Sequence, residues 1–293
     1  MAVDLIVQAL VNGILFGTMY GTAAIGLSLI FGTMRIVFMA QGSMIIFFAY
    51  LCFWLFTLLG IDPYFGMIPV VLIASLIGVG FYHALFKKAA ALQDKISSLL
   101  IAVAVMFVVE NFMTVVWTPN PRAVVTTYGF YAVRLLGIHT TLTRLIALGI
   151  AILATTGLSL FLRKTLVGIA VRACSEDGEA SSLIGISPNR VNAIAFAIGM
   201  GLAGVAGVNF ATTYSFDPNY GFDVCIKALI ALTLGGIGSV GGALAGGIII
   251  GVVESVASFY VGMGWAQCIL FVIFMATLTL KPYGLFGKVV QKA

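Results

Sequence analysis

Long apolar runs separated by short polar segments dominate this chain of 293 residues. A helix needs about 20 predominantly apolar residues to cross a bilayer, and only helices and closed barrels satisfy their backbone polar groups in lipid. The sequence therefore predicts an all-α integral membrane protein, a polytopic helical bundle of about 8–9 spans. The runs lie near residues 5–34, 40–59, 64–86, 96–117, 145–162, 191–214, 224–261 and 265–280.

The composition excludes a soluble fold. Charged residues make up 9% of the chain and hydrophobic residues 61%, whereas an average soluble domain has about 25% charged residues. The spans leave no room for a separate soluble domain, so we expect residues 1–293 to form a single membrane domain. The first run has no basic residue before it and exceeds the about 7–15 apolar residues of a signal peptide, so we expect a retained helix.

No sequence pattern indicates a catalytic, metal or nucleic-acid site. The cysteines stand singly, without the C-x-x-C spacing of a metal or redox site, and no clustered basic face indicates nucleic-acid binding. The chain has no G-x-x-x-x-G-K-[ST] phosphate loop, and no nucleophile, base and orienting group occur together. We therefore expect a non-catalytic protein that itself binds no metal and no cofactor.

Basic residues in three polar segments predict the orientation of the spans. Cytoplasmic loops are enriched in Lys and Arg, so we expect these segments and the C-terminus on the cytoplasmic side. Alternation then places the N-terminus outside, together with residues 118–144, where Pro119, Pro121 and Gly129 favour a loop or surface cap over a further span. The basic residues are Lys87, Lys88 and Lys95, then Arg163, Lys164, Arg172 and Arg190, then Lys281, Lys288 and Lys292.

The run at residues 224–261 has to enter and leave on one side, because the run at 265–280 must also begin outside. The glycine-rich stretch 234–247 supplies a break, since Gly tolerates unusual backbone conformations. We therefore expect a short inbound helix, a glycine-rich turn and an outbound helix. Non-helical backbone at membrane depth is buried in protein or lines a water-filled cavity. Close helix packing, with Gly247 and Gly251 at G-x-x-x-G spacing, is an alternative reading of the same stretch.

A second interruption falls between the first two runs, where Arg35 and Gln41 lie close to apolar residues on each side. We expect a turn or the start of a half-helix there. Broken helices expose N–H and C=O groups, with which many transporters hold polar substrates near the middle of the bilayer. Gln41 either hydrogen-bonds a solute or satisfies backbone groups at the break.

Two acidic residues, Glu110 and Glu254, lie well inside expected spans. A carboxylate in hydrocarbon costs roughly 2.5–3.5 kcal/mol on insertion scales, so each must face protein or water. They either relay a proton or cation, or take part in interhelical hydrogen bonds with groups such as Asn111, Ser255 or Gln267. Because no intramembrane Lys or Arg partner is apparent, we expect the hydrogen-bonded role.

A compact polar island, GIAVRACSEDGEASSLIGISP, interrupts the apolar runs at residues 168–188. Acidic side chains favour the positive start of a helix, and Gly favours the left-handed position just past a helix end. The island therefore predicts a short helix that docks a soluble partner, with another helix starting directly after it. Its expected parts are Ser175 as N-cap, Glu176, Asp177 and Glu179 in the first turn, Gly185 at C′, and Ser187 and Pro188 as the next N-cap and N1.

Several motifs, taken in order, resemble one family of membrane proteins. They are residues 168–173 with the island after them, NRVNAIAFAIGMGLAGVAG from Asn189, LGGIGSVGGALAGGIIIGVVES from Leu234 and KPYGLFG from Lys281. Over nearly the whole chain they resemble the LivH/LivM type permeases, the membrane subunits of branched-chain amino acid ATP-binding-cassette (ABC) importers. Within the island, Glu179, Ala180, Ser181 and Gly185 match the spacing of the E-A-A-x-x-x-G loop of ABC importer permeases.

The resemblance implies a permease subunit in the inner (plasma) membrane. It also implies a second homologous or identical permease, two cytoplasmic ATPase subunits that hydrolyse ATP, and an extracytoplasmic binding protein that delivers a small-molecule substrate. Loop 163–190 would then contain the cytoplasmic coupling helix. The implied coupling residues are Arg172, Glu176, Asp177, Glu179, Ala180, Ser181 and Gly185, and the candidates for the translocation path are Gln41, Gly42, Gly235, Gly236, Gly238 and Ser239.

The substrate stays open between a branched-chain amino acid and urea, a short amide or another small solute. Where relatives commonly read I-N-F-A-H-G and an acidic residue, residues 37–43 of this chain read VFMAQGS. Two other mechanisms also stay open. One is a secondary transporter driven by an ion gradient through Glu110 or Glu254, and the other is a passive channel with the glycine-rich hairpin as its filter.

Overall fold

The computed structural model describes residues 2–88, 95–135, 138–236, 238–281 and 284–286. It confirms an all-α polytopic membrane fold, because eight helices within these residues are long and apolar enough to cross a membrane. Lys288 and Lys292, which the sequence analysis used for orientation, lie outside the described residues. The eight helices are α1 (Ala2–Met34), α2 (Gln41–Leu59), α3 (Pro63–Phe81, extended by the π-helix η1, Tyr82–Phe86), α5 (Lys95–Trp117), α6 (Leu142–Lys164), α9 (Pro188–Thr213), α11 (Val240–Val261) and α12 (Met263–Leu280). Shorter helices are α7 (Leu166–Glu176), α8 (Gly178–Leu183) and the 3-10 helix η3 (Pro218–Tyr220).

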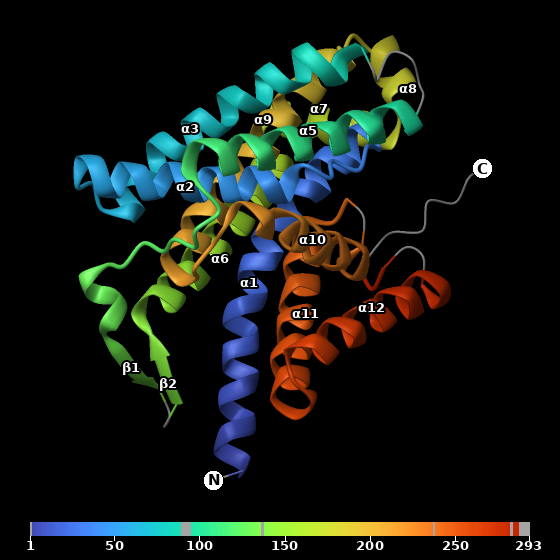
Figure 1. Ribbon diagram of the computed structural model, residues 1–293. Helices are drawn as coiled ribbons and strands as arrows, with labels where there is room; N and C mark the ends of the chain where they lie inside the picture. The colour runs from blue at the N-terminus through green and yellow to red at the C-terminus, as the bar shows by residue number, and fades with distance from the viewer. Residues whose placement is uncertain (1, 89–94, 136–137, 237, 282–283, 287–293) are drawn as a thin grey trace.

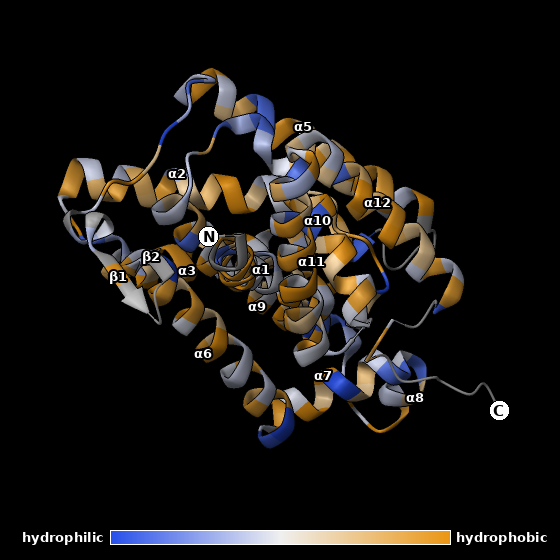
Figure 2. Cartoon of the chain, turned by 90° about the horizontal axis from the view of Figure 1, so that it is seen from below, coloured by the Kyte–Doolittle hydropathy of each residue, from blue (hydrophilic) through white to orange (hydrophobic). Residues whose placement is uncertain are grey.

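Helices α1 and α9 form the centre of the bundle (Figure 1). In their most apolar stretches 83% of the α1 residues and 72% of the α9 residues are buried, against 17% in α5 and 11% in α12. The end-on view in Figure 2 shows α1 and α9 at the centre, with α6 and α12 at the periphery. The peripheral helices therefore leave large apolar faces for lipid or another protein to cover.

Small residues set the contact between α1 and α11. Gly17 and Gly21 of α1 face Gly247 and Gly251 of α11. A Cβ added at Gly17 would lie 2.5 Å from the Cα of Ile248 and 2.6 Å from the carbonyl oxygen of Gly247, so only glycine permits this approach. Close packing through the G-x-x-x-G pair is thereby confirmed.

A helical hairpin follows α9, as the parity of the spans predicted. Its inbound helix is α10 (Gly221–Gly235), its outbound helix is α11, and Gly236 and Gly238 have positive φ in the turn between them. The end of α10 is held by the chain beyond α12, because the N–H of Leu285 donates to the carbonyl oxygen of Leu234 at 2.8 Å. The inbound helix, glycine-rich turn and outbound helix are therefore confirmed.

The chain between α1 and α2 is non-helical and partly buried, which confirms the second interruption. Arg35 follows the last residue of α1 with a left-handed φ of 55°. Phe38 is fully buried, with its ring 5.5 Å from that of Phe86 and 5.0 Å from that of Phe196 between centroids. Because Phe38 packs inside the bundle three residues before α2, the first residue of α2, Gln41, lies in the interior and not at a surface.

The segment between α5 and α6 folds over one end of the bundle, as the expected surface cap, and contains a β-hairpin that the sequence analysis did not anticipate. A 3-10 helix, η2 (Thr127–Phe130), precedes strands β1 (Ala132–Leu135) and β2 (Ile138–Thr141), which pair antiparallel. The Tyr128 hydroxyl donates to Asp62 Oδ2 at 2.8 Å. Burial raises the pKa of Tyr128, so this donor stays protonated at neutral pH. We call this end of the bundle the hairpin end, and the opposite end, with α7 and α8, the island end (Figure 1).

Candidate functional site

The polar island forms two helices, α7 and α8, where the sequence analysis expected one. Asp177 is the N-cap of α8, because its Oδ1 accepts hydrogen bonds from the backbone N–H groups of Glu179 and Ala180 at 2.9 and 3.0 Å. The prediction of Ser175 as N-cap is wrong, since Ser175 lies inside α7 and its hydroxyl donates to the carbonyl oxygen of Arg172. Glu176 ends α7 and is not in the first turn of α8. The Asp177 carboxylate accepts from two backbone N–H groups that have no partner within the helix, so Asp177 and not Ser175 is the cap.

The exit from α8 follows the prediction. Gly185 has a φ of 87°, and its N–H donates to the carbonyl oxygen of Ser182 at 3.2 Å, while the N–H of Ile186 donates to that of Ser181 at 3.1 Å. This pair of bonds is a Schellman motif, which glycine closes without strain. Ser187 occupies the next N-cap position and Pro188 opens α9, although the Ser187 side chain makes no capping bond.

The surface of α8 combines exposed charge with exposed apolar side chains. Leu183 and Ile184 are 87% and 74% exposed, and Glu179 is also exposed. Ser181 is buried, and its hydroxyl donates to the carbonyl oxygen of Asp177 at 2.6 Å. The result is a rigid projection with an apolar tip, which we call the α8 tip (residues 179–184). Of the other expected coupling residues, Ala180 is exposed within the tip, and Arg172, Glu176 and Gly185 are exposed next to it.

The first candidates for the translocation path, Gln41 and Gly42, lie where the first turns of α2 and α10 cross. A Cβ added at Gly42 would lie 2.6 Å from the backbone nitrogen of Cys225. The Gln41 side chain is fully buried, with Nε2 donating to the carbonyl oxygen of Gly199 at 3.4 Å. Its Oε1 has no partner among the described residues. Gln41 therefore connects the non-helical segment before α2 to α9 through one hydrogen bond, and its Oε1 is an unused acceptor.

The remaining candidates lie at the other end of α10. Gly235 and Gly236 are buried where α10 ends, and Ser239 caps α11 by accepting from the N–H of Gly242 at 3.1 Å. Gly42 lies beside Gly221 and Cys225 of α10. Because a helix rises 1.5 Å per residue, about 15–21 Å along α10 separates the two groups. The structure does not bring them into one site.

Glu254 has a partner that the sequence analysis missed. Lys227 Nζ lies 2.6 Å from Glu254 Oε1 and donates to the hydroxyl of Tyr20 at 3.2 Å. The two side chains are only 8% and 18% exposed. The expectation that no intramembrane Lys or Arg partner exists is therefore wrong, because α10 carries Lys227 against α11. A buried ion pair replaces the lone carboxylate.

Glu110 accepts a hydrogen bond from the Ser43 hydroxyl at 2.7 Å, so α5 contacts the first turn of α2. The three partners that the sequence analysis named for the two acids bind elsewhere. Asn111 donates to Phe107 O, Ser255 to Ala9 O and Gln267 to Asp223 Oδ1, at 2.8, 2.8 and 2.9 Å.

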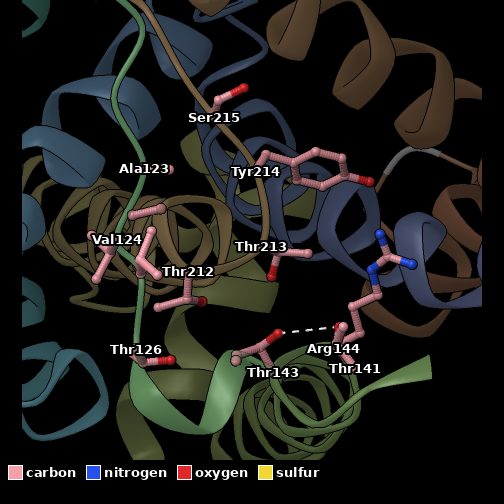
Figure 3. Close-up of a pocket in the computed structure, with 13 residues that line it drawn as sticks. Ala123, Val124, Thr126, Thr141, Thr143, Arg144, Thr212, Thr213, Tyr214 and Ser215 are labelled. Carbon is pink, nitrogen blue, oxygen red and sulfur yellow. Dashed lines mark hydrogen bonds between the residues drawn. The ribbon is translucent and has the colours of Figure 1, made fainter. Parts of the chain in front are cut away.

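A cavity of about 230 Å³ at the hairpin end has no counterpart in the sequence analysis (Figure 3). It lies between the segment before β1, the start of α6 and the outer turn of α9. Hydroxyl side chains and Arg144 line it, together with small apolar residues. No local signal marks this cavity, because its lining comes from three separated stretches, near residues 123–129, 141–144 and 211–215.

Comparison with known proteins decides the family. The model of the family described as branched-chain amino acid transport system / permease component matches residues 9–278. The chain belongs to this permease family. It is therefore a transmembrane permease subunit, as the motifs and the eight apolar helices indicated, and this family does not favour the secondary-transporter alternative.

Relatives of this permease extend over almost its whole length. The high-affinity branched-chain amino acid transport system permease protein LivH of Salmonella typhimurium is 30% identical, over 96% of this chain and 95% of the relative. BraD of Pseudomonas aeruginosa is 29% identical over 96% and 95%. The probable branched-chain amino acid transport permease protein LivH of Methanocaldococcus jannaschii is 29% identical over 94% and 91%. No solved structure matches the permease.

Proposed function

We propose that the permease carries a branched-chain amino acid inward and couples this movement to cytoplasmic ATPase subunits through the α8 tip. The observation that carries the proposal is the α8 tip itself. Two large apolar side chains, Leu183 and Ile184, are exposed beside the charged Glu179 on a turn with caps at both ends. Exposed apolar residues rimmed by polar ones mark protein interaction sites.

A rigid tip suits the transfer of motion. Hydrogen bonds at Asp177 and Gly185 fix the two ends of α8. A displacement of the tip therefore moves α7 and α9 with it. ATP binding can drive the permease between two states only if the ATPase binds them with different affinity. A docking contact that moves with the spans supplies that difference.

The proposed assembly has a second homologous or identical permease, two cytoplasmic ATPases and an extracytoplasmic binding protein. Its N-terminus lies outside and its C-terminus in the cytoplasm, since the basic segments border the island end. The names of the relatives support a branched-chain amino acid as the solute. ATP is used by the partner subunits and not by this chain.

The test is Glu179→Arg in vesicles reconstituted with the purified ATPases and binding protein. The reversed charge weakens docking, and a loss of 1.4 kcal/mol corresponds to about tenfold in the docking equilibrium. We expect substrate-stimulated ATPase activity and uptake to fall by a similar factor while membrane insertion is intact. Vanadate should abolish uptake by the parent.

Lys88→Glu is the matched control, because it reverses an exposed charge on a different segment. It should leave uptake close to that of the parent. Parental uptake by the Glu179→Arg variant would show that the coupling assignment is wrong.

A further inference from the structure

Among the described residues, the lining of the cavity at the hairpin end combines hydroxyl groups with a single cation and contains no acidic residue. Figure 3 shows threonine side chains from α9, from the start of α6 and from the segment before η2 around one space, with Arg144 at its edge. The residues of the lining are Ala123, Val124, Val125, Thr126, Gly129, Thr141, Thr143, Arg144, Ala211, Thr212, Thr213, Tyr214 and Ser215.

Two hydroxyl groups in this lining are buried without a partner. The Oγ1 atoms of Thr126 and Thr213 make no hydrogen bond among the described residues, and Thr126 is only 4% exposed. Other hydroxyls nearby are satisfied, since Thr212 donates to carbonyl oxygens of its own helix and Thr143 to Thr141 Oγ1 at 3.3 Å. A buried hydroxyl without a partner costs about 1–3 kcal/mol. The two unused donors therefore point to a polar guest.

Arg144 is held in place at the edge of the cavity. Its Nη1 donates to Asn12 Oδ1 at 3.1 Å, and its guanidinium carbon lies 4.8 Å from the centroid of the Phe16 ring. Among the described side chains no carboxylate forms an ion pair with it. A planar guanidinium fixed in this way keeps further N–H donors for a carboxylate, which it binds in a charge-assisted and often bidentate manner.

We propose that this cavity is an entry site that binds the carboxylate group of a small aliphatic solute. Figure 3 shows Thr213 between Thr126 and Arg144. The Arg144 guanidinium and the Thr213 hydroxyl donate to the carboxylate, Thr126 lies on the far side of the cavity, and Ala123, Val124 and Ala211 form the apolar wall for the rest of the molecule. A volume of about 230 Å³ admits a solute of this size, since pockets for larger, drug-sized ligands span about 300–1,000 Å³. That the solute is an amino acid on its way inward rests on the proposed function.

The experiment measures binding to the purified permease–ATPase complex in detergent, without ATP and without the binding protein. The probes are L-leucine, isovalerate, a carboxylate that lacks the ammonium group and is one methylene shorter, and L-leucinamide, which lacks the carboxylate. Ligand-observed NMR titration gives each Kd. We expect leucine and isovalerate to bind and leucinamide to bind about tenfold more weakly or worse, because a hydrogen bond to a charged group contributes about 1.5–3 kcal/mol.

Variants assign the binding to the cavity. Arg144→Gln should weaken leucine and isovalerate by about tenfold or more, and Thr213→Val, which keeps the cation, by a smaller factor. Thr156→Val is the matched control, because Thr156 is exposed on α6 and its hydroxyl donates to its own helix at 2.8 Å. It should bind like the parent. A thermal melt of each variant confirms that it is folded.

Three results would overturn the entry site: no binding of any probe, equal binding of leucine and leucinamide, or unchanged binding in both Arg144→Gln and Thr213→Val. Failure of the proposed function looks different. If Glu179→Arg transports normally while the cavity variants lose leucine binding, the coupling assignment fails and the entry site stands. If Glu179→Arg loses uptake and every cavity variant binds like the parent, the reverse holds.

Discussion

The centre of the bundle and the island are built on opposite principles. In the centre, α1 lies against α11 so closely that glycine is required on both helices, and Lys227 is neutralised by Glu254 inside the protein. On the island, α8 is fixed by bonds within a few residues of one another, and its apolar tip is exposed. The centre is therefore specified by contacts between distant segments, and the island by its own local sequence.

This contrast separates two kinds of damage. A change in the centre should lower the stability of the whole permease, because packed interiors relax little around a misfit. A change on the α8 tip should leave stability unchanged and affect only what the tip binds. Substitutions in the two regions test whether the division holds.

The largest loss of stability is expected from Lys227→Met. Removing one member of a buried ion pair leaves the other charge without a partner, which costs about 3–5 kcal/mol in a fully buried site. Glu254 is 18% exposed, so we expect the lower end of this range, about 3 kcal/mol. The melting temperature of the purified permease in detergent measures it.

The double variant Lys227→Met/Glu254→Leu is the control for this loss. It removes both charges, so most of the lost stability should return, because an apolar pair can replace a buried ion pair at little cost. A double variant no more stable than Lys227→Met would show that packing around Lys227, and not its charge, fixes α10 against α11.

An intermediate loss is expected from Gly17→Ala. The new methyl group would lie 2.5 Å from the Cα of Ile248, and overpacking of this kind costs about 1–3 kcal/mol. Gly149→Ala is matched to it, because Gly149 also lies in a span but has open space around it, and alanine is the better helix former by about 1 kcal/mol. The two melting temperatures should therefore move in opposite directions. Equal shifts would contradict the packing argument.

Local features of the fold could be predicted from the sequence. The end of α8 and the start of α9 could be predicted, because Gly185 favours the position just past a helix end and Ser187 and Pro188 favour the start of a helix. The glycine-rich turn after α10 follows from an apolar run that is too long for a single membrane crossing. The break before Gln41 follows from two apolar runs separated by only a few residues. Each of these signals is contained within a few neighbouring residues.

Contacts between distant segments could not be predicted. Lys227 and Glu254 are 27 residues apart. Whether they contact each other depends on the relative position of α10 and α11 along their axes, which hydropathy does not determine. The cavity at the hairpin end has the same origin, because Thr126, Arg144 and Thr213 come from three separate segments: the loop before η2, α6 and α9. None of the three residues is unusual in its own surroundings, so only the fold reveals that they share a space.

The smallest effect, and the one that probes the island alone, is expected from Asp177→Ala. Losing the cap removes the acceptor for the N–H groups of Glu179 and Ala180, which costs about 0.5–2 kcal/mol of local helix stability. Hydrogen exchange at these amides should accelerate and uptake should fall modestly, with the melting temperature of the bundle unchanged. Ser175→Ala is the matched control, because Ser175 bonds only within α7 and should change neither measurement. A larger effect from Ser175→Ala would restore the hydroxyl as the cap and place the start of the coupling helix two residues earlier.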